Sequence, residues 1–199
     1  NPHVLSDILG LDGVAAARNQ LLRDDGKCVN YLAGAVSYSD RVTTVSPTYA
    51  REICTPYFGE GLQDLFLRRH DILSGILNGI DYTYYDPSKD LSIPFRYSAK
   101  KPADKVKNKT ALQEELGLTI GEEKPLIAVI SRLADQKGID LIAGIIEDVL
   151  NYSDAELVVL GKGEYRYEEF FSRLGNNRPK QVKALMMYNK ELAKKIYAA

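Results

Sequence analysis

The chain has 199 residues, and with 45% of them hydrophobic it is long enough for one large or two small globular units. Its formal net charge of −1 provides no overall positive field, so a nucleic-acid partner is not expected. No stretch approaches the roughly 20 apolar residues that a membrane helix needs, which excludes a membrane-spanning protein. Two cysteines, Cys28 and Cys54, lack metal-site spacing and indicate reduced thiols in a cytoplasmic protein.

The first 80 residues contain two segments with the composition of strands, Asp40–Ser46 and Ile72–Leu77. Pro47 ends the first segment, and the turn dipeptide Asn78-Gly79 ends the second. Helices are expected around these strands, at residues 15–22, 29–38, 48–54 and 62–69. Two strands are only half of a sheet, so this region is interpreted as part of an α/β domain.

Residues 81–102 differ in character, because they are rich in Tyr, Pro, Ser and Asp and show no sustained hydrophobic period. We interpret them as an interdomain connection. The lysines that follow lead into a helix predicted over Lys105–Leu116 and ended by Gly117, so they are read as a solvated helix face. A polyanion site is the alternative interpretation of this basic stretch.

A strand, a helix and a second strand follow one another between Leu126 and Leu160. The strands are predicted over Leu126–Ile130 and Leu157–Leu160, and the helix begins at Gly138. Its apolar residues are predicted to share one face: Leu141, Ile142, Ile145, Ile146, Val149 and Leu150. A βαβ unit of this length predicts two parallel strands joined by a right-handed crossover.

After the βαβ unit we expect a helix over Glu164–Leu174, a third strand over Val182–Met187 and a final helix over Glu191–Ala199. Three strands are few for an open α/β sheet. The chain is therefore expected to begin and end inside a domain. Unpaired strand edges in such a piece predict self-association into a homo-oligomer.

The loop between the first strand and the helix of the βαβ unit carries two cations, Arg132 and Lys137. Ligands of open parallel sheets bind at the carboxyl ends of the strands, where this loop lies. Lys137 also precedes a helix N-terminus, a position that favours anions and disfavours a bare cation. Two solvated loop charges are the alternative, but together these features favour an anion-binding site.

Four segments resemble bacterial glycogen synthases and plant starch synthases: Val42–Ile53, Phe58–Leu62, Ile76–Asp81 and Ser131–Gly138. They occur in the order of that family and at about its spacing, so the resemblance covers nearly the whole chain. It implies an α/β fold of the GT-B type, with parts of two Rossmann-like parallel-sheet domains. Residues 1–80 would end the acceptor-side domain, 81–102 would connect the two, and 103–199 would begin the donor-nucleotide-binding domain.

The resemblance further implies a retaining glucosyltransferase that moves glucose from ADP-glucose to the non-reducing end of an α-1,4-glucan. ADP-glucose, ADP and the glucan would then be its partners, in the cytoplasm or, for a plant protein, in a plastid. The chain has no Asp-x-Asp motif of the kind that holds a metal in many glycosyltransferases. We therefore expect neither a metal nor another cofactor.

Five residues are carried over to the site by this resemblance. Arg132 and Lys137 match the Arg and Lys that hold the donor phosphates, and they would neutralise the departing ADP. Tyr188 matches an aromatic position that packs on adenine, with a helix-packing tyrosine as the alternative. Gly161 and Gly163 would let the backbone approach the nucleotide, although a lone G-x-G also forms plain turns.

Some features of the family are absent from these residues. The Lys-x-Gly-Gly-Leu and Glu-Pro-Cys-Gly motifs do not occur, and Lys190 stands where an acidic residue is common. We therefore expect the 199 residues alone not to synthesise glucan. Two other functions stay open, namely a stand-alone or inactive module that binds nucleotide or glucan, and a related GT-B transferase that uses UDP-glucose.

Overall fold

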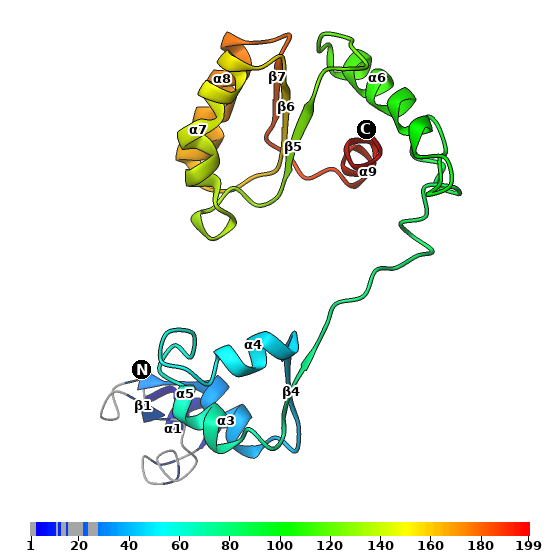
Figure 1. The fold of residues 1–199 in the computed structure, drawn as a ribbon. Coiled ribbons are helices and arrows are strands. Elements are labelled where there is room, and N and C mark those ends of the chain that lie inside the picture. Colours follow the sequence, from blue (N-terminus) through cyan, green and yellow to red (C-terminus); the bar gives the residue numbers. More distant parts are fainter. Residues whose placement is uncertain (1–2, 11, 13–14, 16–21, 24–27) are drawn as a thin grey trace. The chain divides into compact units, whose positions relative to one another are not determined.

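The computed structural model describes residues 3–10, 12, 15, 22–23 and 28–199. The chain divides into two compact units, Asn1–Ile80 and Asp81–Ala199, which are described separately (Figure 1). The helix predicted over residues 15–22 falls mostly outside the described residues. The boundary between the units lies where the connection was predicted to start.

In the first unit, the two predicted strands are present as β3 (Val42–Val45) and β4 (Leu73–Ile76), and they pair in parallel. The core beside this pair contains six buried apolar side chains: Ala33, Val36, Ile53, Leu62, Leu65 and Phe66. They come from or lie next to three helices, α3 (Tyr31–Tyr38), α4 (Pro47–Glu52) and α5 (Gln63–Arg68). The described residues before them form α1 (His3–Leu9) and a short antiparallel pair, β1 (Leu22–Arg23) and β2 (Cys28–Val29).

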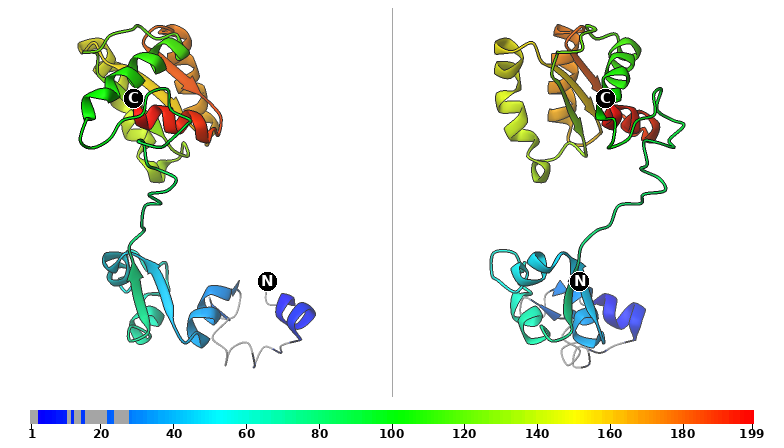
Figure 2. Two further views of the ribbon diagram at one scale, coloured as in Figure 1. Left: turned by 90° about the vertical axis from the view of Figure 1, so that its right-hand side faces the viewer. Right: turned by 45° about the vertical axis from the view of Figure 1, so that its right-hand side comes forward.

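The second unit is built on a three-stranded parallel sheet of order β5-β6-β7. These strands cover Leu126–Ile130, Glu156–Leu160 and Val182–Leu185, so the predicted βαβ unit and third strand are confirmed. The central strand β6 is buried along its whole length, because helices cover both faces of the sheet (Figure 1, Figure 2). Its last four residues, Leu157–Leu160, are apolar, which is the expected sequence for that position, whereas the first, Glu156, is a buried carboxylate that accepts a hydrogen bond from Gln113 at 2.6 Å.

Four helices make up the two covering layers (Figure 1). Helices α7 (Ile139–Tyr152) and α8 (Tyr165–Asn177) pack on the face that includes Leu157 and Val159. Helices α6 (Lys105–Leu116), which follows the short turn η1 (Pro102–Asp104), and α9 (Lys190–Ala198) pack on the opposite face. All four were predicted, with ends that differ by a few residues.

The predicted apolar face of α7 is wrong in one respect. Ile146 and Leu150 are buried together with Ile139, whereas Leu141 is 71% exposed and Ile145 is 60% exposed. At 3.6 residues per turn, Leu141 points roughly 160° away from Ile139, and Ile145 roughly 120° away. The six apolar residues therefore form a band wider than the strip that contacts the sheet.

Residues 81–102, predicted to be the interdomain connection, belong to the second unit and pack on its helices. Ile93 is buried, and the side chain of Asn108 in α6 exchanges two hydrogen bonds with the backbone of Phe95, at 2.7 and 3.0 Å. Asp90 forms an ion pair with Lys194 of α9 at 2.8 Å, and both side chains are largely buried. The role of this segment between two domains stays a prediction, but its second half is fixed to α6 and α9.

We expect Asp90→Asn to lower the free energy of unfolding by about 1–2 kcal/mol at pH 7. Burial alone would raise the pKa of Asp90, but hydrogen bonds from Lys194 and Ser92 outweigh it and lower the pKa from 3.8 to about 2. The carboxylate therefore stabilises the folded chain fully above about pH 4, and this contribution is lost as the pH falls towards 2. Urea unfolding of both proteins at pH 7, 4 and 2.5 measures it, and a difference that does not shrink in acid would contradict the assignment.

Candidate functional site

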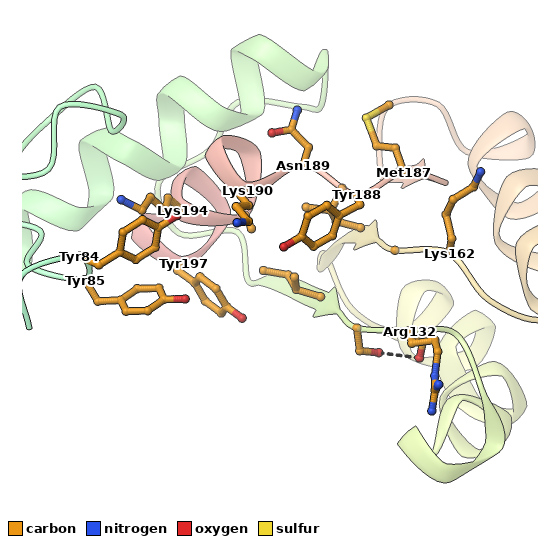
Figure 3. Close-up of a pocket in the computed structure, with 15 residues that line it drawn as sticks. Tyr84, Tyr85, Arg132, Lys162, Met187, Tyr188, Asn189, Lys190, Lys194 and Tyr197 are labelled. Atoms are coloured by element: carbon orange, nitrogen blue, oxygen red, sulfur yellow. Dashed lines mark hydrogen bonds between the residues drawn. The ribbon is translucent and has the colours of Figure 1, made fainter. Parts of the chain in front are cut away.

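A cleft of about 690 Å³ opens at the carboxyl ends of β5 and β6, where the sequence predicted the anion site (Figure 3). One wall comes from the loops that follow these strands, with Arg132 and Lys162. Another wall comes from the start of α9, and Tyr84 and Tyr85 of the segment before α6 complete the lining. The cleft lies entirely within the second unit.

Four cationic side chains line the cleft: Arg132, Lys162, Lys190 and Lys194. Among the described residues, no acidic side chain belongs to the lining. Lys194 is neutralised by Asp90, and hydrogen bonding to that carboxylate raises the pKa of Lys194. The remaining three cations are not balanced by an acid within the lining, so the cleft favours a ligand with several negative charges.

Four tyrosines also line the cleft: Tyr84, Tyr85, Tyr188 and Tyr197. The ammonium group of Lys194 lies 3.8 Å from the centre of the Tyr84 ring, a cation–π contact that orders this end of the cleft. Figure 3 shows Arg132 at one end of the cleft and Tyr84 at the other, with Tyr188 between them. The arrangement suits a ligand that combines an anionic group with a flat ring.

The loop that carries Arg132 is held by its backbone. Leu133 is fully buried, its amide donates to the carbonyl of Lys162 at 3.0 Å, and its carbonyl accepts from the amide of Glu164 at 2.8 Å. The guanidinium group of Arg132 donates to the side-chain oxygen of Gln136 at 2.6 Å and stays exposed. A fixed backbone with an accessible cation is the geometry that an anion site requires.

Gly161 and Gly163 allow a close approach, but the partner in the structure is protein backbone. A Cβ atom on Gly161 would lie 1.9 Å from the carbonyl oxygen of Ser131, and one on Gly163 would lie 2.0 Å from that of Leu133. Both glycines therefore let the loop after β6 lie against the loop after β5. Gly161 also lines the cleft, and the role of both residues towards a nucleotide stays a prediction.

Lys137 is placed differently from Arg132. It ends the short 3₁₀ turn η2 (Asp135–Lys137), directly before Gly138, whose φ of +67° starts α7. Its side chain is exposed and is not among the described residues that line the cleft. The structure thus brings Arg132 to the cleft and leaves Lys137 outside its lining, so a role for Lys137 with the donor phosphates stays a prediction.

Tyr188 lies in the cleft with 83% of its side chain exposed. It precedes Asn189, whose side-chain oxygen caps α9 by accepting from the amide of Leu192 at 3.0 Å. A tyrosine with this exposure is not packed against a helix, which argues against the helix-packing role considered as the alternative for Tyr188. Its ring is free to stack on a ligand.

Several lining residues were missed by the sequence interpretation, among them Lys162, Lys190 and Lys194. Lys190 and Lys194 are four residues apart on α9 and so share a helix face, a spacing that marks them as a pair. Tyr84 and Tyr85 gave no such signal, because the packing of residues 81–102 on α9 depends on contacts between distant parts of the chain.

The described residues contain no group of three or more His, Cys, Asp or Glu side chains that would hold a metal ion. Within the same part of the chain, no helix has the length and apolarity needed to cross a membrane. Cys28 and Cys54 are free thiols.

Comparison with known proteins shows what the chain is similar to. A family model for the starch synthase catalytic domain matches residues 1–68. The glycogen synthase of Clostridium perfringens is 46% identical over 98% of this chain, and that of Bacillus licheniformis is 42% identical over 97%. The chain is similar to glycogen and starch synthases over nearly its whole length. It spans about 40% of the length of these two relatives.

A solved structure extends this similarity to the fold. The catalytic domain of starch synthase IV from Arabidopsis thaliana, bound to ADP and acarbose, is similar over 96% of this chain and 40% of its own. The TM-score is 0.83 and the sequence identity is 35%. The predicted α/β fold of the GT-B type is confirmed by this similarity, as is the resemblance of the four segments to glycogen and starch synthases.

Proposed function

We propose that the second unit binds the donor nucleotide of a retaining glucosyltransferase that moves glucose from ADP-glucose to the non-reducing end of an α-1,4-glucan. The observation that carries this proposal is the cleft, which is lined by four cations and four tyrosines at the carboxyl ends of parallel strands. ADP bound to the Arabidopsis thaliana relative supports adenine as the donor base, and its acarbose supports a glucan acceptor.

Within this proposal, Arg132 and Lys162 provide the charge that the reaction needs. Cleavage of the glucosyl bond leaves negative charge on the diphosphate, and cations fixed near it stabilise the transition state. The planar guanidinium group of Arg132 can bind two phosphate oxygens at once, which is why arginine suits this position. Lys137 is proposed to join them, and no metal is required for this step.

The domain assignment belongs to the same proposal. Residues 1–80 would form the end of the acceptor-side domain, and residues 103–199 the beginning of the donor-side domain. The segment between them, 81–102, would connect the two domains while contributing Tyr84 and Tyr85 to the donor cleft.

Tyr188 is proposed to stack on the adenine ring, and its substitution tests the proposed function. We expect the 199-residue chain to bind ADP in isothermal titration calorimetry, and Tyr188→Ala to weaken binding about tenfold, because stacking of a base on an aromatic ring contributes roughly 1–3 kcal/mol. Tyr165→Ala is the matched control, since Tyr165 is 77% exposed on α8 and outside the described cleft lining. Absence of ADP binding, or an equal loss in the control, would overturn the proposal.

A further inference from the structure

The loop that carries Arg132 also carries a carboxylate, Asp135, at the start of η2. A second carboxylate, Glu164, ends the neighbouring loop after β6. Both loops contribute cations to the cleft, through Arg132 and Lys162. Negative charge beside these cations weakens their attraction for a phosphate group, so the state of the two carboxylates bears directly on the anion site.

Arg166 bridges the two carboxylates. One terminal nitrogen of its guanidinium group lies 2.6 Å from each oxygen of Asp135 and 2.8 Å from an oxygen of Glu164, while Nε donates to the same Glu164 oxygen at 3.0 Å. The bridge joins the loop after β5 to the loop after β6. It lies beside the backbone contact in which Leu133 bonds to Lys162 and Glu164.

Tyr167 contacts both Asp135 and Arg166 of this bridge. It is only 5% exposed, belongs to the core between α8 and the sheet, and donates its hydroxyl hydrogen to Asp135. The guanidinium carbon of Arg166 lies 4.6 Å from the centre of the Tyr167 ring. Hydrogen bonds from Tyr167 and Arg166 lower the pKa of Asp135, and the bond to Asp135 raises the pKa of Tyr167 to about 12. Asp135 is therefore ionised and Tyr167 protonated at neutral pH.

We propose that Arg166 is a positioning residue for the anion site: it neutralises Asp135 and Glu164 and joins their two loops, so that Arg132 and Lys162 meet a diphosphate without competing carboxylates. The inference rests on the proposed function, because it concerns the same cleft. Arg166 does not itself belong to the described lining, so its effect on a ligand passes through its two partners. The exposed ion pair contributes little to stability, and variants of Arg166 are expected to fold.

The test is a double-mutant comparison with ADP as the probe. We expect Arg166→Gln to weaken ADP binding about fivefold at low salt, with a smaller loss in 0.5 M NaCl, because screening reduces the effect of the exposed carboxylates. The double variant Asp135→Asn with Arg166→Gln should recover most of the affinity, since one freed carboxylate is then absent. Arg173→Gln, at an exposed position further along α8, removes the same charge and should change the affinity less than twofold.

A purely structural role for Arg166 predicts another pattern. The double variant would then bind no better than the single one, the loss would not depend on salt, and either result would overturn the inference. Wild-type affinity in Arg166→Gln would do the same. Pyrophosphate, titrated in parallel, separates the two proposals: a chain that binds pyrophosphate but not ADP contradicts the proposed function and still tests Arg166. A chain that binds neither overturns both.

Discussion

Replacing Arg132 with alanine is expected to lower the affinity of the chain for ADP by about 100-fold. Arg132 is the only guanidinium group among the described cleft-lining residues. A hydrogen bond to a charged group contributes roughly 1.5–3 kcal/mol, and a guanidinium group can form two of them with a diphosphate. The loop backbone around it is held by Leu133, so the truncation should remove the cation and leave the fold intact.

Isothermal titration calorimetry measures this loss, with Arg173→Ala as the control for removal of an exposed arginine outside the cleft. Lys137→Ala, measured in parallel, tests the second cation that the family resemblance assigns to the phosphates. A loss comparable to that of Arg132→Ala would show that Lys137 reaches the ligand when it binds. Near wild-type affinity in Arg132→Ala would remove the basis for the diphosphate site.

Gly163→Ala is expected to lower the free energy of unfolding by roughly 3 kcal/mol or more and to weaken ADP binding at least tenfold. The new Cβ would lie 2.0 Å from the carbonyl oxygen of Leu133 and 2.7 Å from its amide nitrogen. These are backbone atoms within a hydrogen-bonded crossing, so they cannot move aside as a flexible side chain would. The two loops must separate, and Arg132 moves with its loop.

Gly144→Ala provides a matched control, because Gly144 lies within α7 and a Cβ there would meet no atom within 4 Å. Alanine in place of glycine inside a helix stabilises by about 0.5–1 kcal/mol, so this variant should be slightly more stable than the wild type. Urea unfolding gives both values. Equal stability of Gly163→Ala and the wild type would mean that the loops do not cross as described.

Much of the second unit could be predicted because its sequence signals are local. The strand Leu126–Ile130 is an apolar run between Pro125 and Ser131, and the predicted helix Lys105–Leu116 ends where Gly117 adopts a φ of +66°. The position of Arg132 at the cleft followed from the general rule that ligands bind at the carboxyl ends of parallel strands.

The rest depends on contacts between parts of the chain that lie far apart in the sequence. Tyr84 enters the cleft because the ion pair between Asp90 and Lys194 fixes its segment to α9. The residues around Asp90 and around Lys194 do not indicate that these two side chains pair. The approach of Gly161 and Gly163 to Ser131 and Leu133 was not predicted, since a G-x-G motif specifies a close approach without naming the partner. Their role towards a nucleotide stays a prediction.

The ion pair between Asp90 and Lys194 links ligand binding in the cleft to the position of the peptide that enters the second unit. The peptide that enters the second unit is itself part of the cleft wall, through Tyr84 and Tyr85. A ligand that restrains these rings therefore also restrains the entering peptide. Because such coupling is reciprocal, a restraint on that peptide is expected to change the affinity of the cleft for its ligand.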